Sequence, residues 1–222
     1  KSEVVDIKDD GSIFLNQKYF KYTYGLRMIK EKEFKSLFGF NTRKEEEEIT
    51  QTHCNMALAI QKVTEEIVIK MVKETKKLTN SNNLCLSGGV ALNCVANEKI
   101  EELGIFENIY IQPASGDAGG SLGAALAINH MYFETNRLYT EEYDLMKGSY
   151  LGPYFSDKEI MIMNKKFKAV FEHINSFEKL SQKVARLISE GNVVGWFQGR
   201  SEFGPRALGN RSILADPRNP EM

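Results

Sequence analysis

Two glycine-rich turns have the composition expected of a phosphate-binding site. Ser87-Gly88-Gly89 follows the short apolar run 84–86, and a second turn, from Pro113 to Gly120, follows the apolar run 109–111. Each turn leads into a segment with a helical pattern. A turn at a helix N-terminus presents free backbone N–H groups and a partial positive charge to an anion. The pair therefore predicts a nucleotide site, although tight strand-to-helix connections also contain glycine.

Asp117 supplies a carboxylate among the glycines of the second turn, in the stretch Gly116-Asp117-Ala118-Gly119-Gly120. A carboxylate in this setting suits a metal ligand, or a hydrogen-bond partner for a ribose hydroxyl or a water molecule. A role as the N-cap of the following helix is equally compatible with the local pattern. The residues alone leave both interpretations open.

Three arginines are interleaved with glycines after the apolar run 192–197: Arg200, Arg206 and Arg211. Guanidinium groups keep their charge and bind phosphate oxygens in pairs, so the cluster suits a polyanion such as a triphosphate or carbamoyl phosphate. Ordinary ion pairs with nearby carboxylates are the alternative: Glu202, Asp216 and Glu221. Pro205 and Gly209 are placed to begin and end a short helix that would turn the arginines to one side.

The histidines and cysteines do not assemble a metal site by their spacing. The three histidines are isolated, without an HxxxH or HExxH pair, and the three cysteines lack CxxC spacing. An odd number of cysteines fits a reducing compartment, so we expect a cytoplasmic location. A net charge of −1 gives no electrostatic case for nucleic acid or an anionic membrane as a partner. No apolar run reaches the length of about 18 residues typical of a transmembrane helix.

Helical and strand patterns alternate along the chain up to about residue 132. We expect a hairpin at 4–15, a long helix at 49–78 with the acidic run 45–48 in its first turn, and strands at 84–86 and 109–111. A helix should follow each of these strands, the second from Gly120 to about Tyr132. This alternation predicts an α/β layer architecture.

A change of composition near residues 141–152 predicts a boundary between two domains, 1–146 and 147–222. Ser156 and Glu159 have the spacing of a capping box at the start of a helix in the second domain. A further helix is expected at 177–190, followed by a buried strand at 192–197.

Three longer stretches resemble the O-carbamoyltransferase family, whose members carbamoylate nodulation factors, cephem antibiotics and aminoglycosides: NLCLSGGVALNCVANEKI, PASGDAGGSLGAA and GWFQGRSEFGPRALGNRSILADPR. The resemblance covers almost the whole chain, and the last motif is highly specific. It implies an α/β fold in two parts. The first would be the later half of an actin/sugar-kinase-like (ribonuclease H-like) ATPase domain, and the second the start of a threonylcarbamoyl-adenylate synthase-like domain.

The resemblance further implies ATP-dependent transfer of a carbamoyl group from carbamoyl phosphate, through carbamoyl-adenylate, to a hydroxyl of a sugar or secondary metabolite. It implies ATP as a cofactor together with a divalent metal, Fe2+ or else Mg2+. By motif, Asp117 would be a metal ligand and would act in catalysis with Arg200 and Arg206. The implied nucleotide contacts are the following: Ser87, Gly88, Gly89, Asn93, Gly116 and Arg211.

The family's metal-binding histidine pair and the rest of its second domain have no counterpart in these 222 residues. We therefore expect this chain to be inactive by itself. A non-catalytic nucleotide-binding module is an alternative, as is a tRNA threonylcarbamoyl transferase, against which the near-zero net charge and the last motif both argue. A sugar kinase follows from the fold alone, which does not determine function. The aromatic residues between 19 and 40 favour core packing over an acceptor pocket, and neither the acceptor nor the oligomeric state is specified.

Overall fold

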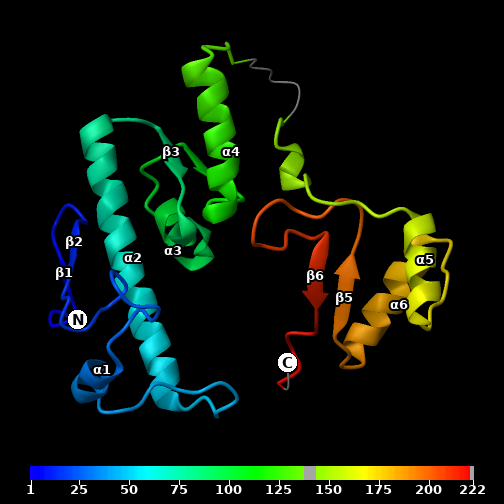
Figure 1. Ribbon diagram of the computed structural model, residues 1–222, viewed down its shortest axis with the longest axis horizontal. Helices are drawn as coiled ribbons and strands as arrows, with labels where there is room; N and C mark the ends of the chain where they lie inside the picture. The colour runs from blue at the N-terminus through cyan, green and yellow to red at the C-terminus, as the bar shows by residue number, and fades with distance from the viewer. Residues whose placement is uncertain (138–143, 221–222) are drawn as a thin grey trace. The chain divides into compact units, whose positions relative to one another are not determined.

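The computed structural model describes residues 1–137 and 144–220, and the chain divides into two compact units (Figure 1). The first unit comprises Lys1–Leu86 and Ala91–Ile111. The second comprises Ser87–Val90 and the chain from Gln112 onward. Both glycine-rich turns therefore belong to the second unit.

The first unit begins with the hairpin expected at residues 4–15. Strands β1 (Val5–Ile7) and β2 (Ile13–Leu15) are antiparallel, with Val5 opposite Leu15. Gly11 in the turn has a φ of +82°, and a Cβ there would lie 2.5 Å from the backbone nitrogen of Met71. Only glycine permits this approach, so the turn packs directly on the long helix that carries Met71.

The aromatic segment that follows contains the short helix α1 (Glu31–Phe38). The ring of Phe34 packs edge to face against both Tyr19 and Phe20. Tyr19 is buried, whereas Tyr24 is 72% exposed and Tyr22 and Phe38 are also exposed, so the expectation of core packing is confirmed for only part of this segment.

Helix α2 (Gln51–Thr79) confirms the long helix. Thr50 is its N-cap and forms a capping box with His53, whose Nδ1 accepts from the Thr50 N–H at 3.0 Å. Asn80, in the left-handed conformation, ends the helix. The acidic run 45–48 lies before the helix, so its expected place in the first turn is wrong. The capping box explains the later start, because it satisfies backbone groups at Thr50 and His53.

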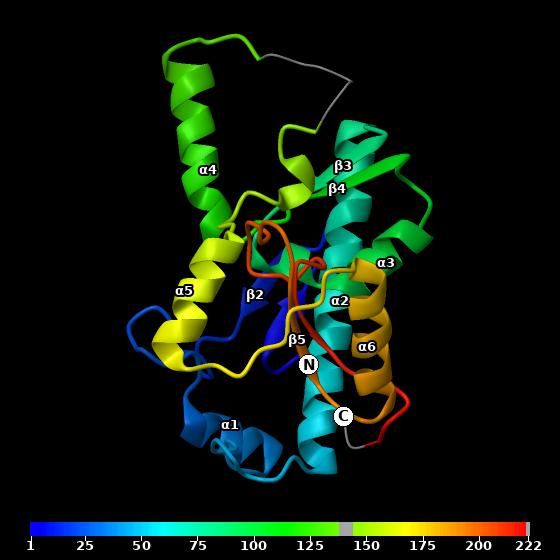
Figure 2. The same cartoon turned by 90° about the vertical axis from the view of Figure 1, so that its right-hand side faces the viewer.

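Strands β3 (Asn83–Leu86) and β4 (Asn108–Ile111) form a parallel pair in which Leu84 lies opposite Ile109. They are connected through the 3₁₀ helix η1 (Gly89–Leu92) and helix α3 (Cys94–Glu102). The core joins Val72 of α2, Leu84 of β3 and Ile100 of α3, and Figure 2 shows α2 and α3 beside the strand pair. These elements confirm the mixed α/β character of the chain.

A buried carboxylate fastens α2 to α3. Glu65 is 7% exposed, accepts a hydrogen bond from Gln61 Nε2 at 2.8 Å and forms an ion pair with Lys99 of α3. Hydrogen bonds from Lys99 and then Gln61 hold the pKa of Glu65 below its ordinary value. The two helices are therefore joined by a charged network as well as by apolar packing.

The second unit contains mostly helices. They are α4 (Asp117–Ala127), the π-helix η2 (Ile128–Tyr132), the 3₁₀ helix η3 (Lys147–Ser149), α5 (Asp157–Phe167) and α6 (Phe177–Ser189). Strands β5 (Val194–Phe197) and β6 (Arg211–Leu214) form an antiparallel pair with Val194 opposite Leu214. Ser156 and Glu159 form the capping box expected for α5.

Two expectations for the second unit are wrong. The strand expected to be buried at 192–197 is half exposed, since Phe197 retains 48% of its surface. Within the described residues it has one partner strand, and its side chains alternate between partly buried, at Val194 and Trp196, and exposed, at Phe197. The short helix between Pro205 and Gly209 does not form, because this segment is an irregular loop between β5 and β6.

Part of the segment expected to contain the domain boundary, residues 141–143, lies outside the described residues. The division 1–146 and 147–222 remains a proposal. None of the described helices combines the length and the apolar character needed to cross a membrane.

Candidate functional site

The two glycine-rich turns line one hollow of about 540 Å³ in the second unit. Five of the residues expected at the nucleotide or metal site lie along it: Ser87, Gly88, Gly89, Gly116 and Asp117. Four further residues of the predicted second turn also line it, without an individual role assigned from the sequence: Ala114, Ser115, Gly119 and Gly120. Gln112 lines it from outside that turn. The structure therefore brings both turns to a single site.

A backbone hydrogen bond joins the turns directly. The N–H of Gly88 donates to the carbonyl oxygen of Ser115 at 2.8 Å. Gly88 has a φ of +97°, a conformation that side chains with a Cβ rarely adopt. A glycine at this position thus allows the first turn to reach the second.

The first turn does not open an α-helix, which corrects the expectation. It runs into η1, and α3 begins only at Cys94 with Asn93 as its N-cap. The Asn93 side-chain oxygen accepts from the Ala96 N–H at 3.1 Å, and this cap fixes the start of the helix. The Asn93 side-chain N–H also donates to Gln61 Oε1 at 2.8 Å. Asn93 belongs to the first unit and does not line the hollow.

The second turn meets a helix N-terminus earlier than expected. Helix α4 begins at Asp117, not at Gly120, and its N-cap is Gly116. The N-cap role considered for Asp117 is therefore wrong. A Cβ on Gly119 would lie 2.0 Å from the carbonyl oxygen of Ala114, so glycine lets the helix start tight against the turn. The N–H of Gly119 donates to the Gly116 carbonyl at 3.1 Å, so the N–H groups without an intrahelical acceptor are those of Asp117 and Ala118, and Asp117 lines the hollow.

Ser115 is a polar residue in the hollow that sequence reasoning missed. It is 5% exposed, and its Oγ has no hydrogen-bond partner among the described residues. An unsatisfied buried hydroxyl costs roughly 1–3 kcal/mol, so a bound water or a ligand oxygen is a natural partner. The signal available in the sequence was its position directly before Gly116 and Asp117. A nucleotide phosphate fits this combination of free N–H groups, hydroxyl and helix N-terminus.

The described residues do not by themselves provide a complete set of metal ligands. They contain no cluster of three or more histidine, cysteine, aspartate or glutamate side chains able to hold an ion. Asp117 is exposed and contributes a single carboxylate at the hollow. His53 is already used in the α2 capping box, and His130 Nδ1 lies 2.7 Å from the carbonyl oxygen of Thr135.

The three arginines lie in or next to the loop from Gln198 to Asn210, which we call the arginine loop, and none lines the hollow. Arg200 Nη1 donates to the Gly152 carbonyl at 2.9 Å. Arg211 forms an ion pair with Glu202, with Nε and Oε2 3.3 Å apart. Arg206 is exposed, and its side chain has no hydrogen-bond or ion-pair partner among the described residues.

The ion pairs considered as an alternative role for the arginines form in part. Glu202 does pair with Arg211, whereas Asp216 pairs with Arg218, and Glu221 lies outside the described residues. One of the three arginines is thus bound to a carboxylate in the part of the chain that the structure describes.

The arginine loop touches the second glycine-rich turn. Gly204 has a φ of +126°, and a Cβ on it would lie 2.6 Å from the carbonyl oxygen of Pro113 and 3.2 Å from the Cα of Ala114. A residue other than glycine would be strained and would also clash with backbone. The loop and the turn are therefore in van der Waals contact within the second unit.

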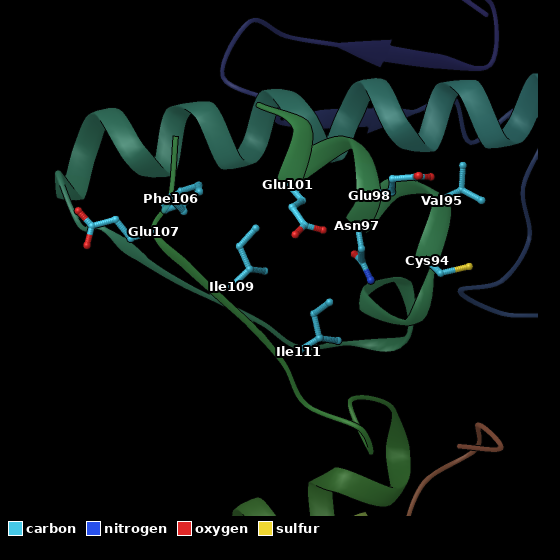
Figure 3. A pocket seen from close by; sticks show the side chains of 9 residues that line it. All are labelled: Cys94, Val95, Asn97, Glu98, Glu101, Phe106, Glu107, Ile109 and Ile111. Atoms are coloured by element: carbon cyan, nitrogen blue, oxygen red, sulfur yellow. The ribbon is translucent and has the colours of Figure 1, made fainter. Parts of the chain in front are cut away.

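A second hollow, of about 710 Å³, lies in the first unit between α3 and β4 (Figure 3). Ile109 and Ile111 project from β4 toward Glu101 of α3. With Glu98 and Glu107, Glu101 makes three carboxylates around this hollow, which disfavour an anionic ligand. The hollow between the glycine-rich turns is therefore the better candidate for a phosphate site.

The sequence matches a family model described as the carbamoyltransferase N-terminus over residues 1–126, more than half of the chain. The chain belongs to the carbamoyltransferase family. A second model, the carbamoyltransferase C-terminus, matches residues 185–222 and includes the whole arginine loop. The domain boundary proposed at 146/147 falls in the interval between the two matches.

Relatives of this carbamoyltransferase chain are much longer than 222 residues. An uncharacterized protein of Synechocystis is 48% identical over 221 residues, which are 99% of this chain and 35% of that protein. Nodulation protein NolO of Bradyrhizobium diazoefficiens is 40% identical over 172 residues, 78% of this chain and 30% of NolO. The 3'-hydroxymethylcephem-O-carbamoyltransferase of Streptomyces clavuligerus is 28% identical over 169 residues, 76% of this chain and 29% of the enzyme. The chain spans about a third of the length of these relatives.

Proposed function

We propose that the intact protein transfers a carbamoyl group from carbamoyl phosphate, in an ATP-dependent reaction through carbamoyl-adenylate, to a hydroxyl of a small molecule. The observation that supports this most is the hollow formed by two hydrogen-bonded glycine-rich turns, against which the arginine loop packs at Gly204. Backbone groups suited to phosphate and the three guanidinium groups thus belong to the same unit, which supports a shared role in handling the phosphates of ATP and carbamoyl phosphate. The name of the cephem relative supports a hydroxyl acceptor.

In this proposal the hollow binds the adenylate. The N–H groups at the start of α4 and the hydroxyl of Ser115 donate to phosphate oxygens, and Ser87, Gly88, Gly89 and Gly116 let the nucleotide approach the backbone. A contact from Asn93 rests on the family resemblance alone, since its side chain has other partners. Arg200, Arg206 and Arg211 supply positive charge for carbamoyl phosphate and ATP.

Formation of the adenylate first breaks the carbamoyl–phosphate bond with water, which releases inorganic phosphate and leaves carbamate; a carbamate oxygen then attacks the α-phosphorus of ATP and displaces pyrophosphate. Transfer forms a bond between the acceptor oxygen and the carbamoyl carbon, breaks the bond from that carbon to the adenylate oxygen, and releases AMP and the hydroxyl proton. The positive charge of the α4 N-terminus favours the departing phosphate. Asp117 would contribute one ligand to a divalent metal, Fe2+ or Mg2+, whose other ligands lie outside this chain. A metal there would polarise the carbamoyl carbonyl group.

The proposed arrangement has residues 1–146 as the later half of an actin/sugar-kinase-like domain and 147–222 as the start of a threonylcarbamoyl-adenylate synthase-like domain, in a cytoplasmic enzyme. The acceptor is proposed as a sugar or secondary metabolite, without nucleic acid or membrane as a partner. Because the chain covers about a third of its relatives, we expect it to be inactive by itself.

The test uses the intact protein with radiolabelled carbamoyl phosphate, ATP, Fe2+ or Mg2+, and a panel of hydroxyl acceptors. We expect ATP-dependent pyrophosphate release and labelled carbamate ester, and no turnover from residues 1–222 alone. Turnover by the 222-residue chain at the rate of the intact protein would contradict the expected inactivity. Tight ATP binding without any carbamoyl product across the panel would favour a non-catalytic nucleotide-binding module.

A further inference from the structure

The arginine loop has no helix or strand, yet one buried side chain holds it at three points. Glu202 is 3% exposed, and its Oε1 accepts the backbone N–H of Leu208 at 2.6 Å and that of Asn210 at 2.8 Å. Its Oε2 lies 3.3 Å from Nε of Arg211. A single carboxylate thus ties the middle of the loop to its end and to the first residue of β6.

Glu202 remains an anion despite its burial. Removal from water acts to raise the pKa of this carboxyl, but backbone N–H groups, among them those of Asn210 and Leu208, outweigh that effect and hold the pKa below its ordinary value. A buried charge is stable only when it is paired and hydrogen-bonded. The negative charge is therefore present at neutral pH and is directed at Arg211.

The neighbouring contacts leave one arginine of the loop without a protein partner. Arg211 is committed to Glu202 and also donates to the carbonyl of Gly204. Arg200 donates to the carbonyl of Gly152. Among the described residues, Arg206 has no such partner, and it lies between Gly204, which touches the second glycine-rich turn, and Leu208, which Glu202 holds.

We propose that Glu202 is a positioning residue: it fixes the arginine loop and neutralises Arg211, so that Arg206 is the arginine that binds the anionic carbamoyl donor. This inference rests on the proposed function and narrows its donor site to one guanidinium group. Glu202 acts through the backbone that carries Arg206 and through its ion pair with Arg211, which keeps that arginine from competing for the donor and fixes the end of the loop.

The experiment measures steady-state kinetics of the intact protein with Glu202→Gln, Arg206→Gln and the double variant. Glutamine keeps an oxygen acceptor for the two N–H groups and removes the charge. We expect each single variant to raise KM for carbamoyl phosphate by about 10- to 100-fold, the scale of a small misplacement of a binding group, with KM for the acceptor unchanged. The double variant should have the same KM for carbamoyl phosphate as Arg206→Gln, because both substitutions act on one contact.

Glu190→Gln is the matched control, because it removes an exposed ion pair with Arg186, and its KM for carbamoyl phosphate should equal that of wild type.

Amide hydrogen exchange provides a readout that does not depend on activity. Glu202→Ala should accelerate exchange at the N–H groups of Leu208 and Asn210, and Glu190→Gln should not. Unchanged exchange at both amides in Glu202→Ala would overturn the proposal. A Glu202→Gln variant with an unchanged KM for carbamoyl phosphate, and only a loss of stability or of active fraction, would also overturn it. Multiplicative increases of KM in the double variant would show that Glu202 does not act through Arg206. A wild-type protein that forms no carbamoyl product overturns the proposed function instead, and exchange then decides whether Glu202 holds the loop.

Discussion

Three glycines of α4 give a graded test of the hollow, because a Cβ meets different surroundings at each. At Gly119 it would lie 2.0 Å from the backbone oxygen of Ala114, whereas at Gly120 and Gly123 it would meet nothing within 4 Å. Gly119 and Gly120 line the hollow, and Gly123 does not. Alanine at Gly119 therefore tests both the packing of the turn and the binding space, alanine at Gly120 tests the binding space alone, and alanine at Gly123 tests neither.

The magnitudes follow from these contacts. Gly123→Ala should stabilise the protein by about 0.5–1 kcal/mol, because alanine loses less backbone entropy in a helix. Gly119→Ala gains the same amount but must displace a backbone carbonyl, and overpacking costs about 1–3 kcal/mol. The net destabilisation should be about 1–2 kcal/mol, which is roughly 2–8 °C in Tm for the 222-residue chain and less for the longer intact protein. Gly120→Ala should resemble Gly123→Ala in stability.

Thermal unfolding and calorimetric titration with ATP check these expectations on the intact protein. Gly119→Ala and Gly120→Ala should weaken ATP binding, and Gly123→Ala should leave it unchanged. Equal stability of Gly119→Ala and Gly123→Ala would refute the close contact with Ala114. Wild-type ATP affinity in both Gly119→Ala and Gly120→Ala would refute the assignment of the nucleotide to this hollow.

Three further changes give distinct outcomes. Asp117→Ala in the intact protein should abolish carbamoyl transfer, measured by product formation, because it removes a proposed metal ligand. Its ATP affinity, measured by calorimetry, should be nearly unchanged, and retained transfer would exclude Asp117 as a metal ligand. Asn93→Ala should cost about 1 kcal/mol in chemical denaturation through loss of the α3 cap, and Asn93→Asp should recover most of it; equal losses in both variants would contradict the capping role. Hydrogen bonds from the side chain and then the backbone of Arg218 lower the pKa of Asp216 from 3.8 to about 2. Because the folded pKa lies below the unfolded one, this stabilisation is complete above about pH 4 and is lost as pH falls through about 2. As the pH falls from about 4 to about 2, the Tm of Asp216→Asn should therefore fall less than that of wild type. Tm curves that run parallel over this range would contradict the stabilising role of the Asp216 charge.

Much of the secondary structure could be predicted because its signals are local. The apolar spacing of α2, the capping box at Ser156 and the apolar run of β4 each suffice to identify an element. Helix starts were less accurate where two local signals competed. Asn93 caps α3 more strongly than the preceding glycines, and tight packing of Gly119 lets α4 begin at Asp117.

What could not be predicted depends on contacts between distant residues. Glu65 faces inward on α2 because Lys99, far along the chain, pairs with it, while Met71, an apolar residue of the same helix, is 52% exposed. Ser115 is buried only because the two turns come together, and Glu202 only because the arginine loop folds around it. The sequence identified the glycines that line the hollow and the arginines of the loop, but no local pattern marks a residue that holds such groups in place.

A structure of the intact protein bound to a non-hydrolysable ATP analogue tests the central claim most directly. The account predicts phosphate oxygens within hydrogen-bonding distance of the N–H groups at the start of α4 and of Ser115 Oγ, beside Gly88 and Asp117. An analogue bound elsewhere, with Ser115 Oγ still without a ligand contact, would contradict the assignment of the glycine-rich hollow as the nucleotide site.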